Sequence, residues 1–266
     1  MSDEPYFSEE FEPRFDNPAG QGPTFRYVIF SQQRTGSSWL ARRLTNLGIF
    51  GVPTEYLNPL ISINFAQRMN CPVRVRDDIA TVNIRKYLGA VEKVRTSSTG
   101  RFGIKIQPNQ IFPLFNGDLV SVATFLQAYD ALIVLTRRDK LGQAISGAIA
   151  DLTDHWRSDG QAPDLAGIDR QRLMSEIANK LAQYVTEDDQ MMTVGRSMGR
   201  PVLYLTYEQM VADPDGTLEQ VLPLLGCKER LSSLSSINVV EVPEPRAGHI
   251  NADVRRCFLR YLEGNT

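Results

Sequence analysis

Short apolar runs alternate along this chain with longer stretches of helical periodicity. Four runs have the β-branched and aromatic content of buried strands, and they cover residues 25–30, 101–106, 130–136 and 201–206. Amphipathic patterns typical of helices cover residues 39–50, 139–152, 169–185 and 216–226. Strands that alternate with helices predict an α/β fold, in which a central, mostly parallel sheet is flanked by helices on both faces.

The first 24 residues break this pattern. They hold six acidic side chains and one basic one, and prolines and glycines interrupt regular structure. Within them, Phe7, Phe11 and Phe15 recur every four residues. Two interpretations stay open: a flexible acidic arm, or an arm that docks its aromatic residues on the body or on a second copy in a homodimer. We therefore divide the chain into an N-terminal arm, 1–24, and one domain, 25–266.

Composition excludes several classes of protein. The 266 residues are 42% apolar and 23% charged, with 29 Lys and Arg against 31 Asp and Glu, which is ordinary for a globular chain. A net charge of −2 argues against general nucleic-acid binding. The three cysteines form no C-x-x-C pair, so we expect no zinc or redox site. The start lacks the pattern of a secretory signal, and no apolar run approaches the roughly 20 residues of a membrane span, so we expect a cytoplasmic protein.

The turn after the first strand carries the clearest chemical signal. Gly36 permits a tight backbone turn, and Ser37 and Ser38 open the following helix, whose free N–H groups and dipole favour an anion. Arg34 adds a fork of donors for oxyanions. The G-x-x-x-x-G-K-[ST] motif of nucleoside triphosphatases is absent. The plainer alternative is a helix start beside a surface arginine.

A second turn strengthens this interpretation. Arg138 closes the apolar run 130–136, and Ser146 follows eight residues later in the next helix. The carboxyl ends of parallel strands meet at one edge of a sheet, where α/β folds bind ligands. Two adjacent anion-binding turns would suit a ligand with two separated phosphates.

These segments resemble the sulfotransferases that use 3′-phosphoadenylyl sulfate (PAPS), and the chain is most similar to the bacterial trehalose sulfotransferase type. The resemblance covers about residues 25–226 and rests on S-Q-x-R-[ST]-G-S-[ST], G-V-P-T-E at 51–55, and G-x-K with Asn109-Gln110 close behind. R-R-D followed by Q-A-I-S completes it, with Trp156 ten residues after Ser146. One departure is the pair Gln32-Gln33 where the family commonly has one glutamine, which leaves the register of these two open.

The resemblance implies a P-loop-like sulfotransferase fold, PAPS as sulfuryl donor, adenosine 3′,5′-bisphosphate as product, and no metal. It places five consecutive residues, Arg34, Thr35, Gly36, Ser37 and Ser38, around the 5′-phosphosulfate, with Arg34 beside the bridging oxygen. Arg138 and Ser146 would hold the 3′-phosphate. Tyr207 would lie near the adenine unless it is a core tyrosine.

The resemblance also assigns candidates for catalysis and for binding the acceptor. Glu55 matches the catalytic base, and a carboxylate near the donor sulfur suits that role; the alternative is a solvated loop acid. Lys105 would line the donor or acceptor site or be an ordinary rim lysine. His155 would contact the sugar or replace Glu55 as base. Trp156 would stack on a sugar ring or pack in the core, and Arg246, in a late loop, would contact a phosphate.

The acceptor implied is a carbohydrate or glycolipid, such as a lipopolysaccharide-type glycan, so the enzyme could work at the inner face of a membrane. The base-rich stretch 56–100 suits an anionic or bulky glycan, and equally a solvated basic face. Two rival functions are a divergent P-loop kinase or nucleoside triphosphatase, and a non-catalytic binding protein on the same fold. The missing lysine counts against the first, and the intact turn residues count against the second.

Overall fold

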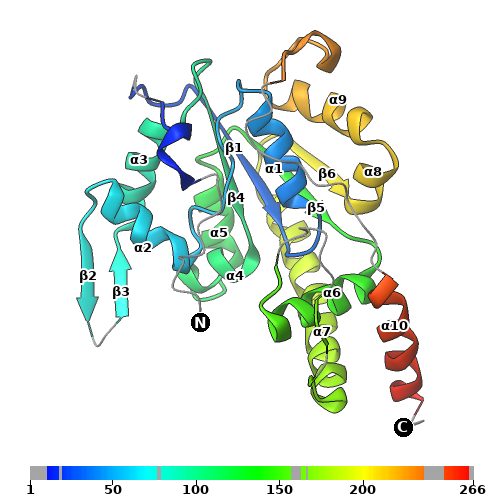
Figure 1. The fold of residues 1–266 in the computed structure, drawn as a ribbon. Helices are drawn as coiled ribbons and strands as arrows, with labels where there is room; N and C mark the ends of the chain where they lie inside the picture. The colour runs from blue at the N-terminus through cyan, green and yellow to red at the C-terminus, as the bar shows by residue number, and fades with distance from the viewer. Residues whose placement is uncertain are drawn as a thin grey trace.

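The computed structural model describes residues 11–17, 20–76, 79–156, 163–165, 167–236 and 249–263. Its main sheet has four parallel strands in the order β4-β1-β5-β6 (Figure 1). These strands are β1 (Phe25–Ser31), β4 (Arg101–Ile106), β5 (Ala131–Thr136) and β6 (Val202–Thr206). The predicted central parallel sheet flanked by helices is confirmed, and each strand lies within one residue of its predicted bounds.

Alternate side chains along β1 enter two different cores. Tyr27 and Ile29 pack with α1 (Ser37–Asn46) and α9 (Pro214–Leu224) on one face. Val28 and Phe30 face the cluster on the other side. That second cluster draws on α2 (Pro59–Arg68), α3 (Ile84–Arg95), α5 (Leu119–Leu126) and the far end of α7 (Arg170–Ser197). Burial on both faces explains why these strands are continuous apolar runs in the sequence.

The close packing of the Tyr27 side chain of β1 against β4 requires a glycine at position 103. Tyr27 crosses β4 at Gly103, where an added Cβ would lie 2.3 Å from the Tyr27 ring. The Tyr27 hydroxyl thereby reaches Phe50 and donates a 3.0 Å hydrogen bond to its carbonyl oxygen. This contact ties the segment after α1 to the sheet.

Helix α7 has 28 residues and is longer than the predicted 169–185. The polar run 186–190 gives no sign in the sequence that the helix continues. In this second part of α7, only a few residues, such as Met191 and Val194, pack toward the sheet. The first part of α7 packs instead with α6 (Lys140–Thr153) and α10 (His249–Leu262) in a third cluster. The long helix α7 therefore contacts α6 and α10 with its first part and the sheet with its last part (Figure 1).

The helices α2, α3, α5 and α10 were not predicted, and several shorter elements were missed as well. The shorter elements are the antiparallel hairpin β2 (Val73–Arg76) and β3 (Ile79–Val82), α4 (Pro108–Ile111), α8 (Tyr207–Ala212), and the 3-10 turns η2 (Pro13–Phe15), η3 (Pro113–Phe115) and η4 (Leu231–Ser233). Within the described ranges, no helix is both long enough and apolar enough to cross a membrane.

The described part of the N-terminal arm contacts the body. Phe11 is 4% exposed, and its ring lies edge-on to Phe65 at a centroid distance of 5.5 Å. The Asp16 carboxylate is 2.8 Å from Arg68 Nη2 and 3.0 Å from Arg95 Nε. The arm therefore packs against α2, the helix that comes after Glu55 in the chain.

Candidate active site

The predicted anion-binding turn lies between β1 and α1, and two residues in it have left-handed backbone. Gly36 has φ of 78°, and an added Cβ would lie 2.8 Å from Met210 Cε. Arg34 has φ of 60°, which is uncommon for a residue with a side chain. The turn therefore requires glycine at 36, and α1 begins at Ser37 with its first N–H groups facing the turn.

The Arg34 guanidinium joins three of the predicted site residues. Its Nε donates to Ser146 Oγ at 2.8 Å, and its Nη1 donates to the Trp156 carbonyl oxygen at 2.9 Å. The Trp156 side chain is half-buried, as is neighbouring His155, whose backbone N–H donates to Thr153 Oγ1 at 3.3 Å. The contact between Arg34 and Ser146 links the anion-binding turn to one of the two residues predicted to hold the 3′-phosphate; the other, Arg138, contacts Thr206.

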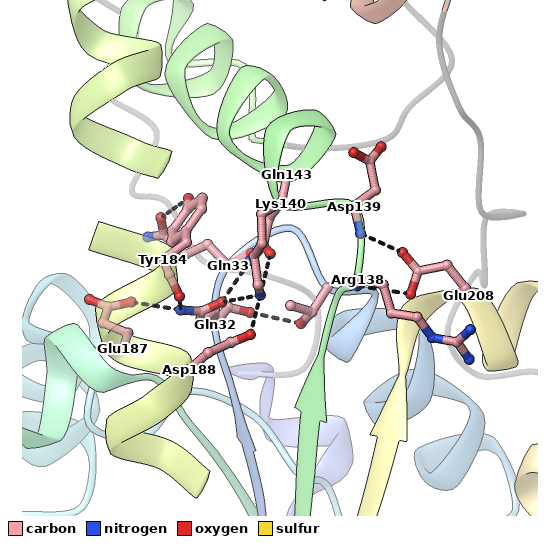
Figure 2. A network of polar contacts seen from close by, with 11 residues as sticks. Gln32, Gln33, Arg138, Asp139, Lys140, Gln143, Tyr184, Glu187, Asp188 and Glu208 are labelled. Atoms are coloured by element: carbon pink, nitrogen blue, oxygen red, sulfur yellow. Dashed lines mark hydrogen bonds and ion pairs between the residues drawn. The ribbon is translucent and has the colours of Figure 1, made fainter. Parts of the chain in front are cut away.

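Arg138 follows β5, the strand next to β1, and its side chain reaches the end of β6. Its Nη2 donates to Thr206 Oγ1 at 3.3 Å, and the backbone N–H groups of Arg138 and Asp139 donate to the Glu208 carboxylate at 3.1 and 3.0 Å. Burial would raise the pKa of Glu208, but these two N–H groups and the charge of Arg137 outweigh it and lower that pKa. Glu208 thus fixes the turn that carries Arg138 (Figure 2).

Tyr207 lies beside the turn, as its proposed place near a bound nucleotide requires. The Arg137 guanidinium sits over the Tyr207 ring, 4.6 Å from its centroid, and donates to the Arg34 carbonyl oxygen at 3.3 Å. The Tyr207 ring also borders Gly36, because a Cβ there would lie 3.1 Å from Tyr207 Cδ2. Arg137 was not singled out in the sequence, although it precedes Arg138.

Gln32 anchors the turn to helices α6 and α7 (Figure 2). Its buried amide donates to the Tyr184 carbonyl oxygen at 2.6 Å and accepts from Gln143 Nε2 at 3.0 Å and Lys140 Nζ at 3.3 Å. The Lys140 ammonium also pairs with the Asp188 carboxylate. Gln33 is half-buried and only its carbonyl oxygen has a short contact, a 2.8 Å bond from Gln143. The two glutamines thus have different surroundings, which the sequence left open.

Glu55 faces the same turn from the edge of the sheet. Thr54 forms a parallel bridge with Ile104, and the Lys105 N–H donates to the Thr54 carbonyl oxygen at 2.9 Å. This pairing brings Glu55 Oε1 to 2.7 Å from Lys105 Nζ, which also donates to Ser38 Oγ at 2.9 Å. One ammonium group therefore connects the candidate base with the anion-binding turn.

Three side-chain amides surround the Glu55 carboxylate. Gln107 Nε2 donates to Oε1 at 3.0 Å, while Gln110 Nε2 and Asn58 Nδ2 donate to Oε2 at 2.7 and 3.2 Å. Burial alone would raise the pKa of Glu55, but the charge and hydrogen bond of Lys105, with those of Asn58 and Gln110, outweigh it and lower that pKa. Glu55 is thus ionised at neutral pH and can accept a proton.

One predicted site residue lies outside the described part of the chain, and the structure adds others that were not predicted. Arg246 lies in 237–248, outside the described residues. Sequence reasoning missed Asn58 and Gln107, and it noted Gln110 only as part of a motif. Over the described ranges, no group of three His, Cys, Asp or Glu side chains is arranged to hold a metal ion.

Comparisons with known proteins identify one family and several similar structures. The family model described as Stf0 sulphotransferase matches residues 26–246. A search of curated proteins found no match. Among solved structures, a sulfotransferase from Alicyclobacillus acidocaldarius is 15% identical at a TM-score of 0.48, with 92% of this chain and 93% of that one covered.

Two further solved structures are similar at lower scores. Retinol dehydratase in complex with androsterone and the inactive cofactor PAP is 14% identical at a TM-score of 0.45, with 92% of this chain and 81% of that one covered. The sulfotransferase domain of the Synechococcus PCC 7002 olefin synthase is 15% identical at a TM-score of 0.41, with 90% and 96% covered.

Proposed function

The chain belongs to the Stf0 sulfotransferase family, and we propose that it transfers a sulfuryl group from PAPS to a hydroxyl of a carbohydrate or glycolipid acceptor. One observation carries the proposal. The Lys105 ammonium contacts both Ser38, in the anion-binding turn, and Glu55, a half-buried and ionised carboxylate. A proton acceptor and an oxyanion site thus lie one side chain apart, as an attack by a hydroxyl on a bound sulfuryl group requires.

The turn after β1 suits the donor. Gly36 adopts the left-handed conformation that the tight turn needs, and the turn presents the backbone N–H groups at the start of α1 to an anion. Arg34 and Lys105 bring two positive charges to this turn, and Arg138 and Ser146 supply donors for a second phosphate. Tyr207 offers a ring beside Gly36 for the adenine.

Glu55 acts on the acceptor. Its carboxylate takes the proton of the acceptor hydroxyl while that oxygen forms a bond to sulfur and the bond from sulfur to the phosphate oxygen breaks. Negative charge grows on the leaving phosphate oxygen, where Arg34 and Lys105 stabilise it electrostatically. Trp156 and His155 lie on the same side as Arg34 and suit contacts with the sugar.

Transfer of labelled sulfate from PAPS tests this function directly. The wild-type chain is incubated with sugars, oligosaccharides and lipopolysaccharide fragments, and the products are identified by mass spectrometry. We expect Arg34→Ala and Glu55→Gln to abolish transfer while both variants remain folded. Full transfer by Glu55→Gln would remove Glu55 as the base.

Calorimetry distinguishes the proposal from a kinase-like function. We expect adenosine 3′,5′-bisphosphate to bind tightly without a metal and Mg²⁺–ATP to bind weakly. Tight binding of Mg²⁺–ATP alone would overturn the proposed donor.

A further inference from the structure

The amide groups that surround Glu55 are themselves fixed in orientation. Gln110 Oε1 accepts a 3.1 Å hydrogen bond from the Gln107 backbone N–H, at the start of α4. Because the oxygen of this amide is occupied there, its Nε2 must face Glu55, where it donates at 2.7 Å. Gln107 and Gln110 are only 6% and 5% exposed, so packing holds both side chains in place.

The donors also match the capacity of the carboxylate. An ionised carboxylate has about four acceptor positions, and Lys105, Gln107, Gln110 and Asn58 supply four donors, two to each oxygen. Lys105 is the one charged group among them. The buried amides of Gln107 and Gln110 thus favour the ionised form of Glu55. They do so without adding a positive charge that would attract the anionic sulfuryl donor.

Resting on the proposed function, we propose that Gln107 and Gln110 are positioning residues of the reaction: they form an amide clamp that keeps Glu55 ionised and aims it at the acceptor hydroxyl. Asn58 makes the longest of the four contacts, at 3.2 Å. It is therefore the donor that the acceptor hydroxyl displaces when it delivers its proton to Oε2.

The variant Gln110→Glu tests the clamp with little change of shape. Its carboxylate still offers an oxygen to the Gln107 N–H, but it places a second acceptor against Glu55 where a donor stood. Two facing carboxylates raise the pKa of one of them. We expect the acid limb of the profile of kcat/KM against pH to move upward by about one pH unit or more, with activity recovering as the pH rises.

The matched control is Asn109→Asp, which adds the same charge at the neighbouring exposed position. Its acid limb should stay at the wild-type pH. Gln107→Met provides a second clamp variant, with a smaller upward shift expected from the loss of one donor, and thermal unfolding verifies that each variant is folded.

The outcomes separate the clamp from the proposed function. A folded Gln110→Glu whose kcat/KM is unchanged, or falls equally at every pH, overturns the clamp when Glu55→Gln is inactive. Full transfer by Glu55→Gln overturns the base role of Glu55 and the clamp together. An upward shift in Gln110→Glu that is absent from Asn109→Asp supports the clamp.

Discussion

Two carboxylates lie on opposite sides of the turn after β1, and each pairs with a lysine. The Glu55 side chain is 18% exposed and pairs with Lys105, while the Asp188 side chain is 22% exposed and pairs with Lys140. Yet the pKa of Glu55 is lowered, whereas burial raises the pKa of Asp188 above its usual value despite the hydrogen bond from Lys140.

The difference lies in the hydrogen-bond donors. Glu55 receives three amide hydrogen bonds in addition to its lysine, whereas Asp188 Oδ1 is buried without a hydrogen-bond partner among the described residues. Burial raises the pKa of neighbouring Glu187 as well. Similar exposure and one lysine each therefore do not fix the charge state of a carboxylate. At Glu55, neutral donors add to the larger effect of Lys105, whereas among the described residues Asp188 Oδ1 has no donor. The comparison supports the proposed role of Glu55 as the base, whereas Asp188 pairs with Lys140, which holds Gln32 beside the turn.

Replacing Lys105 removes the largest of the contributions that lower the pKa of Glu55. In Lys105→Met, burial should dominate and raise the pKa of Glu55, and Ser38 loses its contact with the ammonium group. We expect kcat/KM at pH 7 to fall by about 100-fold or more, with partial recovery at higher pH. Lys86→Met, at an exposed position, is the control. A Lys105→Met enzyme within about twofold of wild type would contradict the role given to this lysine.

Replacing Gln32 tests the support of the donor turn. Gln32→Leu removes the hydrogen bonds that the Gln32 amide forms with Lys140, Gln143 and the Tyr184 carbonyl oxygen. We expect a loss of about 1–3 kcal/mol in the free energy of unfolding and about tenfold weaker binding of adenosine 3′,5′-bisphosphate, measured by calorimetry. Gln33→Leu is the matched control, because its side chain has only a 3.4 Å contact with Tyr184. Equal effects in both variants would show that Gln32 has no special part in the turn.

This pair of glutamines also shows where prediction from sequence stops. The strands and the turn from Arg34 to Ser38 were predictable, because apolar runs and a glycine between polar residues are local signals. The partners of Gln32 lie more than 100 residues away, on α6 and α7, and no local pattern marks them. The same holds for Gln107: its chemistry depends on the bridge from Thr54 to Ile104, which joins segments 50 residues apart. The fold was therefore predictable in outline, and the contacts that set charge states were not.

The same conservative substitution should have opposite consequences at the two carboxylates. Glu55→Gln places an amide among four donors, so we expect the free energy of unfolding at pH 7 to fall by about 1–3 kcal/mol. The raised pKa of Asp188 means that its neutral form suits the fold better, so Asp188→Asn should leave stability unchanged or raise it slightly, although an ion pair is lost. Urea unfolding measures both, with Asp189→Asn at a neighbouring exposed position as control. A loss at Asp188→Asn as large as at Glu55→Gln would remove the distinction between the two sites.

The smallest effect is the pH dependence of these differences, and it has a definite sign. Asp188 has a higher pKa in the folded than in the unfolded chain, so the folded state binds more protons above pH 3.8, and stability falls as the pH rises through that window. Asp188→Asn removes this loss, and its stability relative to wild type should therefore increase from pH 4 toward pH 7 as measured by urea midpoints. Glu55 has a lowered pKa, so the advantage of wild type over Glu55→Gln is complete above pH 4.5 and disappears as the pH falls. The charge of Asp188 contributes to the raised pKa of Glu187, so Asp188→Asn also lowers the pKa of Glu187, and this change adds to the measured difference. Two differences with parallel pH dependence would contradict the opposite pKa shifts of Glu55 and Asp188.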